Sequence, residues 1–404
     1  MRAFQWVKER SVSLLAIVIM GILIFLPTGY EDALIYQGTE RVRAEVLETN
    51  ENNIYSSGLI QSGEQECQVK ILDGKFKGEV SNATNMLSGS LEADKIFQKG
   101  DIANVVISHK DGEILSITMS DHFRISKEIF LALIFVVLLI AFAGKNGLRA
   151  IYSFVITILT IWKILVPAYL GGLNPLWVGI GITTFLTVII IWLVYGFEKR
   201  TLAASGGAIL GVLVTCVMGI VFTEQFQIHG TVMDYSETLL YAGFQNLNLT
   251  QIFMSSIFIG ASGAMMDLAV DITSAVHEVV QKKPEIGWKE AVGSGMNVGR
   301  AAMGTMTTTL LIAYSGGYIA LLMVFMAQGT PIDQILNYKY VSAEILETIV
   351  GSMGLVTVAP FTALVSGVLL TRKKHYVKEE STLKNKKEEE STISADILPK
   401  TSEI

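Results

Sequence analysis

The chain has 404 residues, of which 51% are hydrophobic and only 17% are charged, and its formal net charge is −6. That charge content is low for a soluble protein, and the apolar residues occur in long runs, so a polytopic membrane protein is expected and a nucleic-acid partner is not. The two cysteines, Cys67 and Cys216, are too few and too separated to form a disulfide framework.

Long apolar runs predict an α-helical protein whose main partner is the lipid bilayer. About 20 apolar residues suffice to cross the hydrocarbon as a helix, which satisfies its own backbone hydrogen bonds there. A cleaved signal peptide is the alternative for the first run. Eight transmembrane helices are expected, at residues 11–27, 128–143, 149–167, 175–195, 202–222, 250–270, 303–327 and 344–370.

Lysine and arginine are concentrated in alternate connections between these runs. They occur at Lys145, at Lys199 and at Lys282, whereas residues 168–176 and 223–251 contain none. The positive-inside rule then places both termini in the cytoplasm of a multi-pass protein of the plasma or inner membrane.

Residues 28–127 differ in character from the rest of the chain. Short alternating stretches such as VRAEVLE, CQVKILDG and IANVVISH are separated by turn sequences such as HKDG. They predict a small β-rich extracytoplasmic domain, an OB- or SH3-like barrel, whose expected role is structural or partner-binding. Residues 1–27 form the N-terminus with the first helix, residues 128–370 form a seven-helix membrane domain, and residues 371–404 are a charged tail predicted to be disordered.

One membrane segment, GASGAMMDLAVDITSAVHEV at residues 260–279, carries acids in helical register. At about 100° per residue, one stripe contains small and acidic residues and the opposite side contains Leu268, Ile272, Val276 and Val279. The stripe consists of Gly260, Gly263, Ala264, Asp267, Asp271, Ser274 and Glu278. Small residues of this kind allow another helix to approach closely.

The next span repeats the arrangement with different chemistry. Gly293, Asn297, Arg300, Thr307 and Thr308 share one face there. The two helices are consecutive and antiparallel, and Asp267 and Arg300 fall at similar depths near the cytoplasmic boundary. Arg300 is therefore expected to face Asp267 and Asp271, because pairing removes much of the cost of a charge in the bilayer.

Three interpretations of this charge cluster are open. It is a structural salt bridge that fixes a helical hairpin, an ion or proton site with Asp267 as the titrating group, or a divalent-cation site formed by Asp267, Asp271 and Glu278. No catalytic residue, cofactor site or established metal site is expected, because both aspartates lie on one helix and no nucleophile or nucleotide motif occurs. An enzyme is the least favoured class.

The chain resembles the YibE/F family of bacterial multi-pass membrane proteins. The resemblance rests on residues 260–279, on GSGMNVGRAAMGTMTTTLLIAYSGG, and on EILETIVGSMGLVTVAPFTALVSGVL, and with the β-rich domain it covers most of residues 41–370. It implies a multi-pass inner- or plasma-membrane protein and supplies no substrate, reaction or catalytic residue.

Two functions from different classes are therefore expected. The first is a transporter or permease for an unknown small molecule or ion, coupled to protons or another ion. The second is a scaffold, assembly factor or regulator whose extracytoplasmic domain binds protein partners. The folded outer domain favours the second, since a minimal permease does not need one.

Overall fold

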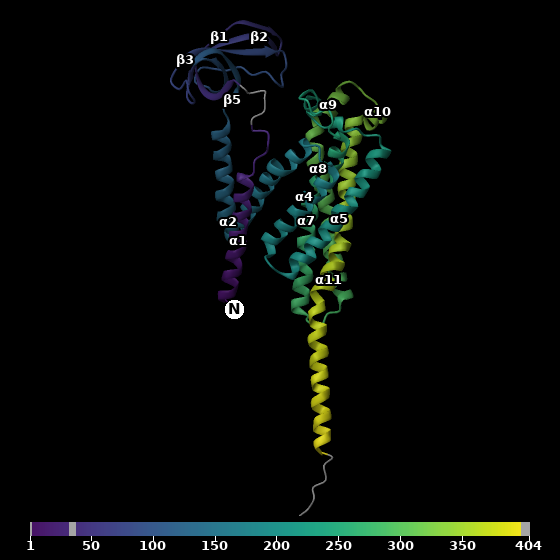
Figure 1. The fold of residues 1–404 in the computed structure, drawn as a ribbon. Coiled ribbons are helices and arrows are strands. Elements are labelled where there is room, and N and C mark those ends of the chain that lie inside the picture. Colours follow the sequence, from purple (N-terminus) through teal and green to yellow (C-terminus); the bar gives the residue numbers. More distant parts are fainter. Residues whose placement is uncertain (1, 32–37, 397–404) are drawn as a thin grey trace, which may run out of the picture. The chain divides into compact units, whose positions relative to one another are not determined.

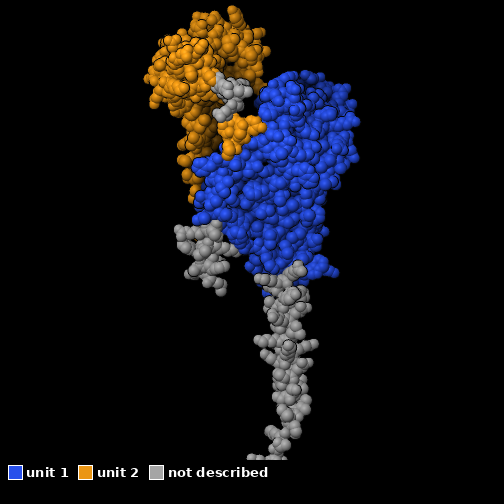
Figure 2. Space-filling view, in the orientation of Figure 1, with its two compact units in different colours: residues 1–26, 148–404 blue, residues 27–147 orange. Residues whose placement is uncertain are grey.

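The computed structural model describes residues 2–31 and 38–396, and the side chains of residues 12–31 and 38–371. The chain forms two compact units, coloured separately in Figure 2. One contains residues 27–147, and the other contains residues 1–26 and 148–404.

The first unit contains a closed five-stranded barrel with neighbours in the order β1-β2-β3-β5-β4. This confirms the predicted small β domain, and five-stranded Greek-key barrels are the architecture of OB-folds. The strand β1 pairs antiparallel with both β2 and β4, whereas β3 and β5 meet through one parallel pair, Thr84 and Thr118. The strands are β1 (Thr39–Ser57), β2 (Ile60–Ile71), β3 (Val80–Ser88), β4 (Ile102–Lys110) and β5 (Glu113–His122).

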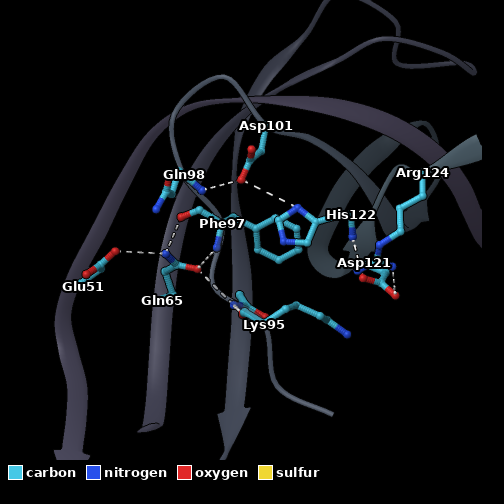
Figure 3. Close-up of polar contacts among 10 residues, drawn as sticks. Glu51, Gln65, Lys95, Phe97, Gln98, Asp101, Asp121, His122 and Arg124 are labelled. Atoms are coloured by element: carbon cyan, nitrogen blue, oxygen red, sulfur yellow. Dashed lines mark hydrogen bonds and ion pairs between the residues drawn. The ribbon is translucent and has the colours of Figure 1, made fainter. Parts of the chain in front are cut away.

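Alternation along the strands fills the barrel with apolar side chains, such as the buried Val42, Ala44 and Val46 of β1. A fully buried polar residue, Gln65, lies among them (Figure 3). Its Nε2 donates to the carbonyl of Phe97 at 2.8 Å, and its Oε1 accepts from the Phe97 amide and from Asn85 Nδ2, each at 3.0 Å. These bonds hold the segment between β3 and β4 against the barrel core.

The remaining elements are helical. Helix α1 (Arg2–Phe25) precedes the barrel, and α2 (Ile125–Thr160) follows it after two residues. The others, labelled in Figure 1 where there is room, are η2 (Ile161–Leu165), α3 (Val166–Leu170), α4 (Pro175–Tyr195), α5 (Lys199–Gln225), η3 (Gly230–Val232), α6 (Ser236–Tyr241), α7 (Leu249–Lys282), α8 (Trp288–Ser315), η4 (Gly316–Tyr318), α9 (Ile319–Ala327), α10 (Ile332–Asn337) and α11 (Lys339–Asp396).

Six helical stretches among the described residues are long and apolar enough to cross a membrane, so the prediction of eight separate spanning helices was wrong. Among the residues whose side chains are described, the first predicted span contributes a shorter apolar helix, Val12–Phe25, and the second and third fall within one stretch, Ile125–Leu170. Inside that stretch Gly144 leaves the helical conformation (φ 53°, ψ −123°), between the two segments that the sequence separates. A positive φ of this kind suits glycine, which has no Cβ to clash.

In the second unit α5, α7 and α8 pack against α11, the helix coloured yellow-green to yellow in Figure 1. Glycines make this packing close. A Cβ on Gly207 of α5 would lie 2.6 Å from the Cα of Thr362 in α11, and a Cβ on Gly299 of α8 would lie 2.9 Å from the Cβ of Ala359. Helices can therefore approach at these points only because the side chains are absent.

Helix α11 continues beyond Thr371 to Asp396 and so includes most of the charged tail. Residues 397–404 of that tail lie outside the described part of the chain. The disorder of the tail stays a prediction.

Candidate functional site

Helix α7 has one buried side and one open side. Leu268, Ile272 and Val276 have no exposed surface and lie in the main apolar core. We call the opposite side the α7 polar face; apart from the half-buried Ser256, its members are exposed. It consists of Ser256, Gly260, Gly263, Asp267, Asp271, Ser274 and Glu278. The exposure of these residues agrees with the stripe expected from the helical period.

Asp267 and Asp271 lie one turn apart on this face, close enough for the charge of Asp271 to act on Asp267. Among the described residues, neither carboxylate takes part in an ion pair or a side-chain hydrogen bond. Glu278 differs, because it pairs with Lys282 at 2.6 Å near the end of the helix. The two aspartates are therefore the unsatisfied charges of α7.

The expected ion pair with Arg300 is absent from the described residues, and Arg300 is exposed. Arg300 and Asp271 do lie at a similar level along the two helices. Their sequence neighbours are in contact, since a Cβ on Gly299 would lie 3.1 Å from Ile272 Cδ1. The direction is wrong: Gly295 and Gly299 take up the packing face of α8, which turns Arg300 outward. An ion pair between Lys283 and Glu290 at 2.7 Å joins the two helices instead.

The other predicted residues of α8 are also separate from the aspartates. Asn297 is exposed and Thr307 is half-buried. The hydroxyls of Thr307 and Thr308 donate to carbonyls of their own helix, at Met303 (2.9 Å) and Gly304 (3.2 Å). Such bonds satisfy the hydroxyls locally and give no sign of a lined pathway.

Beside Asp271, the C-terminal end of α4 contributes a tyrosine. Tyr195 Oη donates to the Val270 carbonyl at 2.6 Å and is hydrogen-bonded to Ser274 Oγ at 2.7 Å. The guanidinium of Arg200 lies 4.7 Å from the centre of the Tyr195 ring and pairs with Glu198 at 2.6 Å. Tyr195 therefore stands between a cation and the acids of the α7 polar face.

A second acid pair, Glu344 and Glu347 of α11, meets the other end of the α7 polar face. Both side chains are half-buried, and Glu347 Oε1 accepts a hydrogen bond from Ser256 Oγ at 2.9 Å. Glu344 Oε1 is buried and has no partner among the described residues. The hydroxyls of Tyr314 and Tyr318 lie within electrostatic reach of both carboxylates.

This second pair was missed in the sequence, where the two acids look like ordinary residues of a helix N-terminus. Their spacing of three residues, which places both on one side of an otherwise apolar helix, is the signal that could have found them. Tyr314 also links the pair to the α7 polar face, because a Cβ on Gly260 would lie 2.6 Å from its hydroxyl oxygen.

The described residues contain no group of three or more His, Cys, Asp and Glu side chains that could hold a metal ion. Asp267, Asp271 and Glu278 therefore do not form the divalent site that was one interpretation of the sequence. The arrangement that remains is one pair of carboxylates on the α7 polar face and a second pair on α11 at the other end of that face, with tyrosine and serine hydroxyls beside them.

Six candidate membrane helices and an N-terminal five-stranded barrel define a multi-pass membrane protein with a separate β domain. Two sequence-family models match the chain. The model described as YibE/F-like protein matches residues 131–372, and the model described as YibE/F family N-terminal domain matches residues 36–122. The chain therefore belongs to the YibE/F family. Comparison with curated proteins and with solved structures found no match.

Proposed function

We propose that the chain is a transporter or permease of the plasma or inner membrane in which protons, or another small cation, move along the α7 polar face. The observation that carries the proposal is the acid pair Glu344 and Glu347, half-buried in a membrane helix without an ion-pair partner among the described residues. Ionisable groups at such positions are costly and usually belong to ion or proton pathways.

The α7 polar face runs from the acid pair of α11, which contacts it at Ser256, to its own acid pair, Asp267 and Asp271. Ser256, which binds Glu347, and Asp267 are separated by eleven residues of α7, or roughly 16 Å at 1.5 Å per residue. Gly260 and Gly263 lie between them and present no side chain. A Cβ on Gly263 would meet nothing within 4 Å, whereas at Gly260 the Tyr314 hydroxyl lies against the face. A small ion or water on this face would therefore meet open space at Gly263 and a hydroxyl at Gly260. Carboxylates at both ends suit a positively charged cargo or coupling ion.

The proposal includes an orientation. The clusters of Lys and Arg favour a cytoplasmic location for the α7–α8 connection and both termini, with the barrel on the opposite side. This orientation requires α1 to cross the membrane once and the stretch Ile125–Leu170 to cross it twice, with the reversal at Gly144. Glu344 and Glu347 then belong to the outer half of the pathway, and Asp267 and Asp271 to the inner half.

Proton flux into proteoliposomes tests the proposal. With pyranine inside and a potassium diffusion potential as driving force, the wild-type chain should acidify the lumen faster than protein-free liposomes. Glu347→Gln and Asp267→Asn should each lower the protein-dependent rate by at least about tenfold, since each removes a titrating group from the path. Glu290→Gln is the matched control, because Glu290 is exposed, pairs with Lys283 and lies outside the α7 polar face.

Wild-type liposomes that acidify no faster than empty ones would refute proton movement, and an Asp267→Asn variant with full flux would refute the assignment of the path.

A second candidate function is partner binding by the barrel. The turn between β1 and β2 exposes three large apolar or aromatic side chains, with Tyr55 at 75%, Leu59 at 84% and Ile60 at 48% exposure. Contiguous exposed apolar residues on a soluble domain often mark a protein interface. Protection of Leu59→Cys from a membrane-impermeant maleimide in intact cells would support this function, and full labelling would count against it.

A further inference from the structure

The interface between α4 and α7 contains hydroxyl groups at both ends. At one end, Tyr169 Oη is hydrogen-bonded to Ser255 Oγ at 2.8 Å. At the other end, Tyr195 Oη is hydrogen-bonded to Ser274 Oγ at 2.7 Å. Of the four residues only Tyr169 lies outside α4 and α7, in the short helix α3 that leads into α4.

Two further hydroxyls in α4, those of Thr183 and Thr187, lie between these ends and have no hydrogen-bond partner among the described residues. Thr183 is 2% exposed and Thr187 is 0% exposed. Burying a hydroxyl without a hydrogen-bond partner is unfavourable, so such groups are usually satisfied by water.

Some other buried threonines of the bundle satisfy themselves within their own helices, whereas Thr160, Thr223 and Thr362, like Thr183 and Thr187, have no partner among the described residues. Thr215 donates to the Gly211 carbonyl at 3.0 Å, and Thr371 donates to the Gly367 carbonyl at 2.7 Å. Thr183 and Thr187 have carbonyls at the same spacing in α4 but do not use them. Their hydroxyls therefore remain available to a ligand in the α4–α7 interface.

The register of the two helices places these threonines in that interface. Gly179 of α4 lies against Ser255, since a Cβ there would be 3.0 Å from Ser255 Cβ, and Tyr195 lies against Ser274. The two helices thus run in the same direction with a nearly constant offset. Thr183 and Thr187, one and two turns beyond Gly179, are then level with the part of α7 that contains Ser262.

We propose that the α4–α7 interface holds ordered water on Thr183 and Thr187, and that this water is a proton route between the Tyr169–Ser255 pair and the Tyr195–Ser274 pair beside Asp271. The inference rests on the proposed function and adds the path that supplies Asp271. Between Thr187 and Tyr195 the same side of α4 carries Ile191, which is fully buried. Ile191 closes the route in this conformation, so proton passage requires movement at that side chain.

Water-to-protein magnetisation transfer measured by solid-state NMR tests the hydration directly. The full chain, labelled with ¹³C-threonine and placed in bilayers, should show rapid transfer from water to Thr183 and Thr187. Thr183→Val and Thr187→Val each remove one signal and so assign it. Thr215, buried and bonded within its own helix, is the reference for slow transfer. Transfer to Thr183 and Thr187 as slow as to Thr215 would overturn the proposal.

Proton flux tests whether the water is a route. The double variant Thr183→Val with Thr187→Val should lower the protein-dependent flux at least about fivefold, whereas Thr215→Val should leave it unchanged. Rapid water transfer combined with full flux in the double variant would overturn the route. If the wild-type chain carries no protons, the proposed function and the route both fail, and the magnetisation transfer still decides whether the interface is hydrated.

Discussion

Asp267 and Arg300 illustrate which properties of single residues can be predicted from the sequence. Their similar depth follows from counting residues along two consecutive antiparallel helices, and contacts such as Gly299 with Ile272 agree with it. The direction of Arg300 depends on which side of α8 packs, and two glycines decide that. Likewise, the contact of Glu347 with Ser256 joins residues 91 positions apart and has no local signal.

Asp94 gives a prediction for a single residue of the barrel. Its carboxylate accepts hydrogen bonds from the amides of Ser88, Gly89 and Ser90 and from the Ser88 hydroxyl, at 2.6 to 2.9 Å, and these bonds lower its pKa. The pKa of Asp94 is lower in the folded barrel than in the unfolded chain. The charged carboxylate therefore stabilises the barrel fully at pH values above the unfolded-state pKa, and this stabilisation is lost as the pH falls through the folded-state pKa.

We therefore expect Asp94→Asn to lower the thermal midpoint of the barrel by a few degrees at pH 7, with a difference that shrinks below about pH 4. Differential scanning fluorimetry across pH measures it. Glu92→Gln, an exposed change two residues away, should have no such effect. A deficit in Asp94→Asn that is equally large at pH 3 would contradict this account.

Among the elements, strands that contain a clearly alternating stretch were predictable. The stretches VRAEVLE, CQVKILDG and IANVVISH begin in β1, β2 and β4. The strand β3 (VSNATNMLS) places the polar Asn85 at a buried position, where it bonds to Gln65, and this breaks the apolar alternation of its sequence. The number of separate spanning helices was overestimated because two predicted spans fall in one stretch, Ile125–Leu170, which continues through a kink at Gly144, and hydropathy alone does not show whether a chain continues or ends at a glycine.

The contact between α5 and α11 supports a prediction at the same scale. A Cβ on Gly207 would lie 2.6 Å from the backbone of Thr362, whereas a Cβ on the adjacent Gly206 would meet only Val365 Cγ1, at 3.6 Å. Alanine favours both helical positions by up to about 1 kcal/mol, so the difference between the two variants isolates packing. Gly207→Ala should be less stable than Gly206→Ala by about 1–3 kcal/mol, measured by thermal or denaturant unfolding in detergent. Equal stability would show that α5 and α11 can separate at little cost.

For the whole molecule, the division into a barrel and a membrane bundle follows from composition, and the family models match the two parts separately. The side of the membrane on which each part lies is inferred from the distribution of Lys and Arg and not from packing contacts. It therefore needs its own measurement.

The native cysteines make that measurement simple. Cys67 and Cys216 are buried, and burial raises the pKa of the Cys67 thiol to about 11, so little reactive thiolate is present at pH 7. In intact cells, a membrane-impermeant maleimide should label Asp111→Cys in the barrel and should label Lys289→Cys only after permeabilisation. The opposite pattern would invert the proposed orientation. In the same assay, Leu59→Cys should be labelled like Asp111→Cys unless a partner covers the β1–β2 turn.

The junction between the barrel and α2 has a mechanical consequence. Phe123 donates its amide hydrogen to the Ile102 carbonyl at 2.8 Å and lies under the Arg43 guanidinium, while Arg124 pairs with Asp121 at 3.0 Å. A linker of only two residues, both held to the barrel by these contacts, thus joins the barrel to α2. Residues 125–144 form a rod of roughly 30 Å, the thickness of a hydrocarbon layer. A rotation of the barrel would therefore be transmitted along this helical segment to Gly144, where the backbone departs from the helical conformation.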